Sequence, residues 1–289
     1  MLLCTLHPMA NDFGACGRFA PSPTGDLHLG NLRTAVAARV LAGPNARFVV
    51  RMEDLDRATS RRSIAFRQQL DLAAVGVLSD VPVVFQSDRF DHYRAIVDRL
   101  HDQGMTYECF CTRKEIQQAI SAPHGEVARY PGTCRDLSAS ERARRSSERP
   151  AAIRLRSNPG AGTASLIDDI VLVRNDGVPA YNLAVVVDDE LQGVTQVVRG
   201  DDLAHVTPSQ MYLQRLLGFR TPEYVHLPLM VGPDGQRLSK RHGDVSLGDC
   251  LRLGFSAHAV RTALLRSLDE GSNGWDESSS LAQWLKSLL

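Results

Sequence analysis

The stretch GRFAPSPTGDLHLGNLRTA, residues 17–35, decides the fold that the sequence predicts. Residues 15–20 are apolar enough for a short strand, a turn rich in proline and glycine follows, and residues 31–43 have the spacing of a helix. Such a strand–turn–helix junction offers backbone N–H groups and the positive end of a helix dipole to a phosphate. His28 could donate to a phosphate oxygen, and Gly30 would let a nucleotide lie against the backbone. The alternative is a histidine that only caps the helix.

The chain continues with the same alternation of strand and helix. RFVVRM (47–52) predicts a buried strand, and we expect helices near residues 60–76 and 88–103. This order favours an α/β fold with a parallel sheet and right-handed crossovers. The first turn matches neither G-x-x-x-x-G-K-S/T nor G-x-G-x-x-G, which disfavours a P-loop enzyme and a dinucleotide-binding dehydrogenase.

Beyond residue 104 the alternation breaks, and residues 105–165 have the composition of an insertion. DIVLVRNDGVPAYNLAVVVDD (169–189) predicts a hairpin that turns at Asn175-Asp176-Gly177. Further elements are expected as a strand (194–200), a helix closed by Gly218 (208–218), a strand (226–232) and a helical tail after Asp244. The mixed charges of ERARRSSER (141–149) indicate a solvated helix face, and Trp275 and Trp284 are expected to pack.

Composition limits the classes of protein that fit. The 289 residues are 43% hydrophobic and 23% charged with a net charge of zero, so nucleic acid could bind only at a local basic patch. No apolar run is long enough to span a membrane, and MLLCTLHPMANDFGAC makes a poor signal peptide. We therefore expect a cytoplasmic protein whose cysteines are reduced, so that clustered cysteines suggest a metal before a disulfide.

A lysine in the stretch RLSKRHGD (237–244) departs from the usage of the chain. The sequence has 33 lysines and arginines, and only Lys114, Lys240 and Lys286 are lysines. A compact, mobile ammonium group suits phosphate chemistry in a way that the planar guanidinium fork does not. Lys240 is therefore a candidate phosphate-binding residue.

The pair formed by HLGN (28–31) and LSKR (238–241) resembles the "HIGH" and "KMSKS" motifs of class I aminoacyl-tRNA synthetases. VRMEDLDR, AYNLAVVVDD, VVRGDDL and TPSQMYL lie between them in the order of the glutamyl branch of that class. The resemblance implies a Rossmann-like sheet that uses ATP with Mg²⁺. It implies catalytic roles for His28 and Lys240, and ATP contacts from His28, Gly30, Asn31 and Lys240.

The same resemblance implies a glutamate site. Two arginines could grip the side-chain carboxylate, a tyrosine could add a hydroxyl, and Glu53 could pair with the α-ammonium. The full set of expected glutamate contacts is Arg18, Phe19, Ala20, Pro21, Ser22, Glu53, Tyr181 and Arg199. For Asp54 and Asp56 we favour a structural interpretation, a charge cluster at a helix start.

A cysteine cluster lies in the predicted insertion. Cys109-x-Cys111 precedes Tyr130-x-x-x-Cys134, and three thiolates with one further ligand would suit tetrahedral zinc. The pattern resembles the glutamyl-queuosine tRNA(Asp) synthetases, which implies that Tyr130 is the fourth ligand, although the spacing between the two halves is longer here. The alternative is a set of small buried cysteines without a metal.

Together these features predict an enzyme of class I synthetase type that activates L-glutamate with ATP. The resemblance implies transfer of the glutamate to queuosine in the anticodon arm of tRNA(Asp), by a monomer with one structural Zn²⁺. The alternatives are a truncated glutamyl-tRNA synthetase that charges an acceptor end, and a non-catalytic RNA-binding paralogue. The 45 residues after Asp244 are too few for the usual anticodon-binding module. The expected parts are an extension (1–16), a catalytic domain (17–104 and 166–235), a zinc-bearing insertion (105–165), and a KMSKS-type loop with a helical end (236–289).

Overall fold

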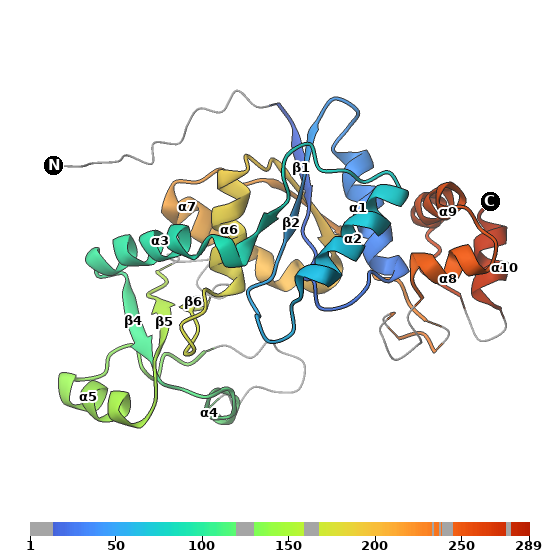
Figure 1. Cartoon of the computed structure of the whole chain (residues 1–289). Helices are drawn as coiled ribbons and strands as arrows, with labels where there is room; N and C mark the ends of the chain where they lie inside the picture. The colour runs from blue at the N-terminus through green and yellow to red at the C-terminus, as the bar shows by residue number, and fades with distance from the viewer. Residues whose placement is uncertain are drawn as a thin grey trace. The chain divides into compact units, whose positions relative to one another are not determined.

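The computed structural model describes residues 14–119, 130–158, 168–232, 234–236, 238, 245–275 and 279–289. The chain divides into two compact units, and Figure 1 labels many of their helices and strands. Unit 1 comprises Met1–Asp88, Asp189–His205 and Arg220–Leu289, and unit 2 comprises Arg89–Asp188 and Val206–Phe219. The predicted insertion belongs to unit 2, which also includes the segments that flank it. The predicted domain boundaries stay a prediction.

Unit 1 is built on a parallel sheet. Its strands, among the described residues, have the order β3-β2-β1-β7-β8, and every pairing is parallel. The strands are β1 (Cys16–Phe19), β2 (Arg47–Met52), β3 (Val84–Phe85), β7 (Gln196–Gly200) and β8 (Glu223–Leu227). The helices are α1 (Leu29–Leu41), α2 (Arg62–Ala74), α8 (Leu247–Arg252), α9 (Ala257–Asp269) and α10 (Leu281–Ser287). Two 3₁₀ helices are η1 (Gln86–Asp88) and η2 (Asp201–Val206), and the last residue of η2, Val206, belongs to unit 2. The α/β prediction with a parallel sheet is confirmed.

The sequence explains why α1 starts and stops where it does. His28 caps the helix with extended backbone angles and exchanges hydrogen bonds with Asn31 in a capping box, which satisfies N–H groups of the first turn. Gly43 follows the helix with a φ of 94°, which a residue with a side chain rarely adopts. The strand β2 is buried along almost its whole length, as expected for an inner strand of a parallel sheet.

The C-terminal helices pack within unit 1. The helix α9 contacts α1, α8 and α10. Trp275 and Trp284 lie in the core with ring centroids 5.7 Å apart, so the packing role predicted for both is confirmed. The buried Arg33 of α1 donates to the carbonyl of Pro228 and to the side chain of Asn273, which ties α1 to two loops of the unit.

Unit 2 contains an antiparallel sheet in the order β4-β5-β6, within the residues that the structure describes. Its strands are β4 (Thr106–Cys109), β5 (Ala152–Leu155) and β6 (Val171–Val173). Its helices are α3 (Phe90–Asp102), α4 (Arg113–Ala119), α5 (Ala139–Glu148), most of α6 (Tyr181–Leu191) and α7 (Thr207–Leu217). Gly218 closes α7 in the left-handed conformation, as predicted. The helix α5 has no buried residue, which confirms the predicted solvated face.

The hairpin predicted at residues 169–189 is wrong in its second half. Only Val171–Val173 forms a strand, one isolated bridge joins Val173 to Pro179, and the following stretch is the helix α6. Five consecutive residues of α6, from Leu183 to Val187, are buried. A helix buried on all sides loses the polar face that gives helical periodicity, so its valine-rich run could not be distinguished from a strand.

The predicted strand at 226–232 is displaced. The strand β8 is Glu223–Leu227, and it begins three residues earlier than expected.

None of the described helices combines the length and the apolar character needed to cross a membrane.

Candidate functional site

The junction between β1 and α1 is organised around His28. The backbone N–H of Asn31 donates to Nδ1 of His28 at 3.3 Å, and the backbone N–H of His28 donates to Oδ1 of Asn31 at 3.3 Å. His28 is therefore a capping residue, as the structural alternative proposed. Because Nδ1 accepts, the proton of the neutral ring sits on Nε2, which is the donor that a phosphate oxygen would require. The cap and the predicted ATP contact are thus compatible.

Gly30 is needed at this junction because of the histidine itself. A Cβ atom on Gly30 would lie 2.9 Å from Cε1 and 3.0 Å from Nδ1 of His28, and 3.6 Å from Cβ of Met230. The contacts of about 3 Å with the His28 ring are too short for a Cβ atom without strain, whereas 3.6 Å is an ordinary contact. The absence of a side chain at Gly30 therefore lets the imidazole lie against the backbone of the first turn of α1.

Both flanks of the KMSKS-type loop are fixed beside this junction. After the loop, the carbonyl of Val245 accepts from the N–H of Leu29 at 3.0 Å, and Ser246 forms an isolated bridge with His28. Before the loop, the N–H of Leu238 donates to the carbonyl of Met230 at 2.7 Å, and Met230 is the neighbour of Gly30. Lys240 and the other residues of 239–244 lie outside the described residues. The loop that carries Lys240 therefore begins next to Met230, beside Gly30, and ends at the HLGN junction.

A buried charge network lies at the carboxyl ends of β1 and β2. Arg18 faces Asp189 with 3.7 Å between Nε and Oδ1, and Arg51 donates to Asp189 at 2.8 Å. Arg51 also pairs with Glu53 at 3.4 Å between NH2 and Oε1. Arg18 lies opposite Val49 in the register of the two strands, so Arg51 and Glu53 extend the same face. The predicted residues Arg18 and Glu53 are brought into one network, through two residues that the sequence did not single out.

Arg199 has a different setting, at the end of β7. Its Nε donates to Nε2 of His226 at 3.3 Å, and its guanidinium lies 4.9 Å from the centre of the Tyr224 ring. Burial lowers the pKa of His226, the charge of Arg199 lowers it further, and Asp201 opposes the shift. A neutral His226 can accept the hydrogen bond that orients Arg199. Tyr181, the remaining predicted side-chain contact, lies in unit 2 at the start of α6.

The end of β1 and the turn after it contain the other predicted glutamate contacts. Phe19 and Pro21 are buried, Ala20 is half-buried and Ser22 is exposed. The carbonyl of Pro21 accepts from the N–H of Glu53 at 2.9 Å, which holds the turn against the end of β2. Their roles toward glutamate stay a prediction.

The neighbouring acids have other tasks than the predicted one. Asp54 is buried and accepts from the N–H and the hydroxyl of Ser87 at 2.9 Å and 2.6 Å, so its assignment to a helix start is wrong. Asp56 accepts from Ala58 and Thr59 in a turn ahead of α2, whose N-cap residue, Arg61, makes no side-chain capping hydrogen bond. Both acids shape the backbone after β2.

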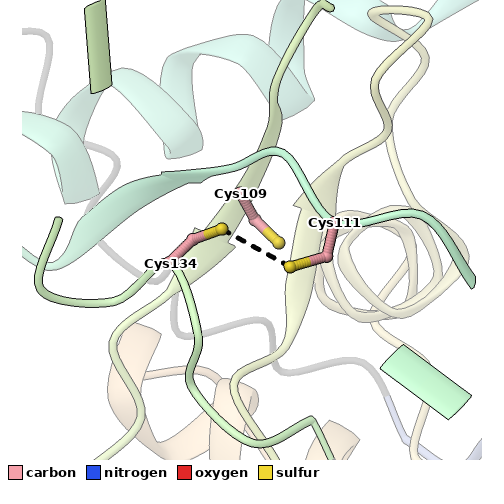
Figure 2. Close-up of side chains that lie close together, drawn as sticks. All are labelled: Cys109, Cys111 and Cys134. Carbon is pink, nitrogen blue, oxygen red and sulfur yellow. Dashed lines mark hydrogen bonds between the residues drawn. The ribbon is translucent and has the colours of Figure 1, made fainter. Parts of the chain in front are cut away.

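The three clustered cysteines of unit 2 converge, as Figure 2 shows. The sulfur atoms of Cys109, Cys111 and Cys134 lie within 4.8 Å of one another, and those of Cys111 and Cys134 are 3.5 Å apart. The hydroxyl of Tyr130 lies 3.3 Å from Sγ of Cys109 and 3.8 Å from Sγ of Cys111. Zinc–sulfur bonds of about 2.3 Å in a tetrahedron separate two sulfur atoms by about 3.8 Å. The spacing of the donor atoms therefore fits a tetrahedral metal.

The surroundings of the cluster add cationic groups. Arg154 stacks over the Tyr130 ring at 3.9 Å, and Arg145 donates to Sγ of Cys134 at 3.6 Å. Burial, together with the hydrogen bond to Cys134, raises the pKa of Cys111 to about 12. Burial also raises the pKa of Cys134, but hydrogen bonds from Phe110 and from neighbouring groups outweigh it and lower the pKa overall. The cluster thus has the ligand types, the spacing and the nearby positive charge that a thiolate metal site requires.

The sequence is similar to class I aminoacyl-tRNA synthetases over most of its length. The model of the family "tRNA synthetases class I (E and Q), catalytic domain" matches residues 16–269. The chain is 53% identical over 270 residues to the glutamyl-Q tRNA(Asp) synthetase of Nocardia farcinica, covering 90% of this chain and 86% of that protein. The chain belongs to the glutamyl-Q tRNA(Asp) synthetase family. The predicted resemblance and the predicted class I synthetase type of enzyme are thereby confirmed.

The glutamyl-tRNA synthetases are more distant members of the same class. The glutamate–tRNA ligase of Syntrophotalea carbinolica is 38% identical to this chain over 268 residues. That match covers 86% of this chain but only 56% of the ligase. A crystal structure of a glutamate tRNA ligase from Elizabethkingia meningosepticum in complex with its amino acid superposes with a TM-score of 0.68 at 26% identity. That match covers 94% of this chain and 64% of the solved chain. The class I fold predicted from the sequence is confirmed.

Arg51, Asp189 and His226 were not predicted as site residues, although one signal for Arg51 was present in the sequence. Arg51 is a charged residue inside the otherwise apolar strand RFVVRM, and a buried charge requires a partner. The unfavourable place of Asp189, in the last turn of α6 where the helix dipole disfavours an acid, could be recognised only once this segment was known to be a helix. An arginine and an aspartate that are each unfavourable alone are candidates for mutual pairing.

Proposed function

We propose that this protein activates L-glutamate with ATP to form glutamyl-adenylate and transfers the glutamate to the queuosine base in the anticodon arm of tRNA(Asp). One observation supports the activation step above the others. After the loop that contains Lys240, Val245 is hydrogen-bonded to Leu29 at the junction that His28 caps, and before the loop Leu238 is hydrogen-bonded to Met230, which lies beside Gly30. This arrangement supports an ATP site to which two sequence motifs, about two hundred residues apart, both contribute.

The proposed roles follow from charge and position. His28, Gly30, Asn31 and Lys240 bind ATP, with the histidine donating from Nε2 and the lysine stabilising the departing pyrophosphate, and Mg²⁺ bound with ATP would neutralise charge on its phosphates. Arg18 and Arg199 bind the side-chain carboxylate of glutamate with the hydroxyl of Tyr181, and Glu53 pairs with its ammonium group. Phe19, Ala20, Pro21 and Ser22 line the amino acid. The α-carboxylate attacks the α-phosphorus directly, so the protein contributes positioning and charge stabilisation without a covalent nucleophile.

For the cysteine cluster we propose one structural zinc ion. Cys109, Cys111, Cys134 and Tyr130 would hold it, because their donor atoms have the spacing of a tetrahedron. When bound, the ion would join β4 to the segment around Cys134 and stabilise unit 2. Its role is structural, since all four positions are occupied by protein groups.

The choice of RNA rests on similarity. Two relatives that bear the name glutamyl-Q tRNA(Asp) synthetase are 53% and 49% identical to this chain over 86% and 82% of their length, whereas the glutamate–tRNA ligase of Syntrophotalea carbinolica is 38% identical over 56% of its length. Queuosine presents a cyclopentene ring with hydroxyl groups much as a terminal ribose does, so the same adenylate could react with it. A splayed base in a single-stranded loop is also a common target of proteins that recognise RNA. We expect a cytoplasmic monomer.

Pyrophosphate exchange that depends on glutamate tests the activation step. Lys240→Ala should lower the exchange rate by about a hundredfold or more, the scale of losing one preorganised contact in the transition state. Lys240→Arg should also be impaired, because the planar fork cannot follow the phosphates as a point charge does. Exchange at the wild-type rate by the Lys240→Arg protein would contradict the role proposed for this lysine.

A further inference from the structure

Asp189 occupies a place where an aspartate is costly. It lies in the last turn of α6, near the negative end of the helix dipole, together with Asp188 and Glu190. Its side chain is 4% exposed, so the carboxylate has also lost most of its hydration. A residue that is unfavourable by both criteria needs compensation from its neighbours.

Two arginines compensate this carboxylate, and they come from adjacent strands. Oδ1 of Asp189 accepts from Arg51 at 2.8 Å and faces Nε of Arg18 at 3.7 Å. The Arg51 side chain is fully buried, and it also donates to Oε1 of Gln192 at 2.8 Å. Asp189 therefore holds one strong hydrogen bond and one purely electrostatic contact.

The position of the Arg18 guanidinium depends on Asp189 more strongly than the position of the Arg51 guanidinium does. In the described part of the chain, Arg18 has one hydrogen bond, from NH1 to the carbonyl of Val198 at 3.4 Å, and its Nε has none. Without Asp189, the guanidinium groups of Arg18 and Arg51 would lose the negative charge between them. Repulsion between two buried cations would then move Arg18, the less firmly held of the two.

The network continues from Arg51 to Glu53, with 3.4 Å between NH2 and Oε1. The charges alternate from Arg18 through Asp189 and Arg51 to Glu53. The two outer residues are those assigned to the two ends of glutamate, the side-chain carboxylate and the ammonium group. The two inner residues lie between them and have no assigned substrate contact.

We infer that Asp189 and Arg51 are positioning residues that fix the separation between Arg18 and Glu53 and thereby select glutamate over the shorter aspartate. The inference rests on the proposed function, since it needs Arg18 and Glu53 to bind the amino acid. A rigid separation matters because aspartate lacks one methylene, and one methylene typically changes discrimination by roughly 10- to 200-fold.

The test compares Asp189→Asn with Asp188→Asn. Asp188 is the preceding residue of the same helix, is also buried, and pairs with Arg89 and Tyr93 in unit 2. Both variants lose one buried charge from α6, but only the first loses the partner of Arg18. Glutamate-dependent and aspartate-dependent pyrophosphate exchange, the KM for ATP and the melting temperature are measured for both.

Asp189→Asn should raise the KM for glutamate about tenfold and lower the preference for glutamate over aspartate by a similar factor, with the KM for ATP within about twofold of wild type. Asp188→Asn should lower the melting temperature without changing either kinetic property. A wild-type KM and preference in Asp189→Asn, or equal changes in both variants, would overturn the inference.

If Asp189→Asn does not fold, Arg51→Lys takes its place. A single ammonium group cannot span Asp189, Gln192 and Glu53 as the planar fork does, so the KM for glutamate should rise in the same way. An unchanged KM in Arg51→Lys would overturn the inference. Wild-type protein with neither glutamate-dependent exchange nor a glutamate-induced rise in melting temperature would instead refute the proposed function.

Discussion

We expect the substitution Gly30→Ala at the HLGN junction to lower kcat/KM for ATP while leaving the free energy of unfolding nearly unchanged. The added Cβ would lie 2.9 Å from Cε1 of His28, about half an ångström short of the 3.4 Å at which ordinary contact begins. The neighbour that must yield is the imidazole, since it lies nearest. Its movement would weaken the hydrogen bond from Asn31 to Nδ1 and turn Nε2 away from the ATP phosphates.

The magnitudes can be worked out from this geometry. Loss of the cap costs about 1 kcal/mol, whereas alanine is favoured over glycine in a helix by about 0.8–1.0 kcal/mol. The two effects nearly cancel, so the free energy of unfolding should change by less than about 1 kcal/mol. A misplacement of 1 Å can cost about a hundredfold in rate, so a shift of half that size should lower kcat/KM for ATP by about tenfold.

The assay is pyrophosphate exchange at varied ATP, with thermal unfolding in parallel. Gly248→Ala is a matched control, because Gly248 is the second residue of α8 and also follows a capping-box N-cap, Ser246. A Cβ on Gly248 would meet Oγ of Ser246 at 3.5 Å, an ordinary contact. Gly248→Ala should therefore keep wild-type exchange. If Gly30→Ala also kept wild-type kcat/KM for ATP, the reasoning about the His28 ring would be refuted.

Two other predictions concern the metal cluster and His226. We expect elemental analysis to find one zinc per wild-type chain and none in Cys134→Ser, whose amide exchange should speed up more in β4 and β5 than in β1 and β2. The control Cys250→Ser changes an isolated buried cysteine and should keep the zinc. Wild-type protein without zinc would reject the site. The lowered pKa of His226 means that the unfolded chain binds more protons below its ordinary value of 6.5, so stability should fall as the pH drops below that value. His226→Gln should flatten this pH dependence of the melting temperature between about pH 5 and 6.5, and an unchanged slope would show that another group is responsible.

Most of the catalytic fold could be predicted because its signals are local. The strand at 47–52 and the helix that follows residue 28 have clear boundaries in the sequence, and α7 ends at Gly218 as expected. The helix α6 could not be predicted in the same way, because tertiary burial on all sides removed the polar positions that mark a helix. The failure there concerns periodicity, and the residues themselves are compatible with either structure.

The site was predictable in its parts but not in its connections. His28, Gly30, Arg18 and Glu53 stand in motifs, whereas Asp189 reaches Arg18 only because β1 and the end of α6 meet in three dimensions. The capping role of His28 was foreseen as an alternative, and the structure shows that the cap fixes the tautomer that the proposed ATP contact requires.

The destination of the glutamate tests the central claim most directly. Labelled glutamate, ATP and the protein are incubated in separate reactions with queuosine-containing tRNA(Asp), with the same tRNA lacking queuosine, and with tRNA(Glu), and each tRNA is then cut into fragments. The account predicts label in the anticodon-arm fragment of queuosine-containing tRNA(Asp) and in no other fragment. Label at the 3′ end of tRNA(Glu), with none on queuosine-containing tRNA(Asp), would contradict it.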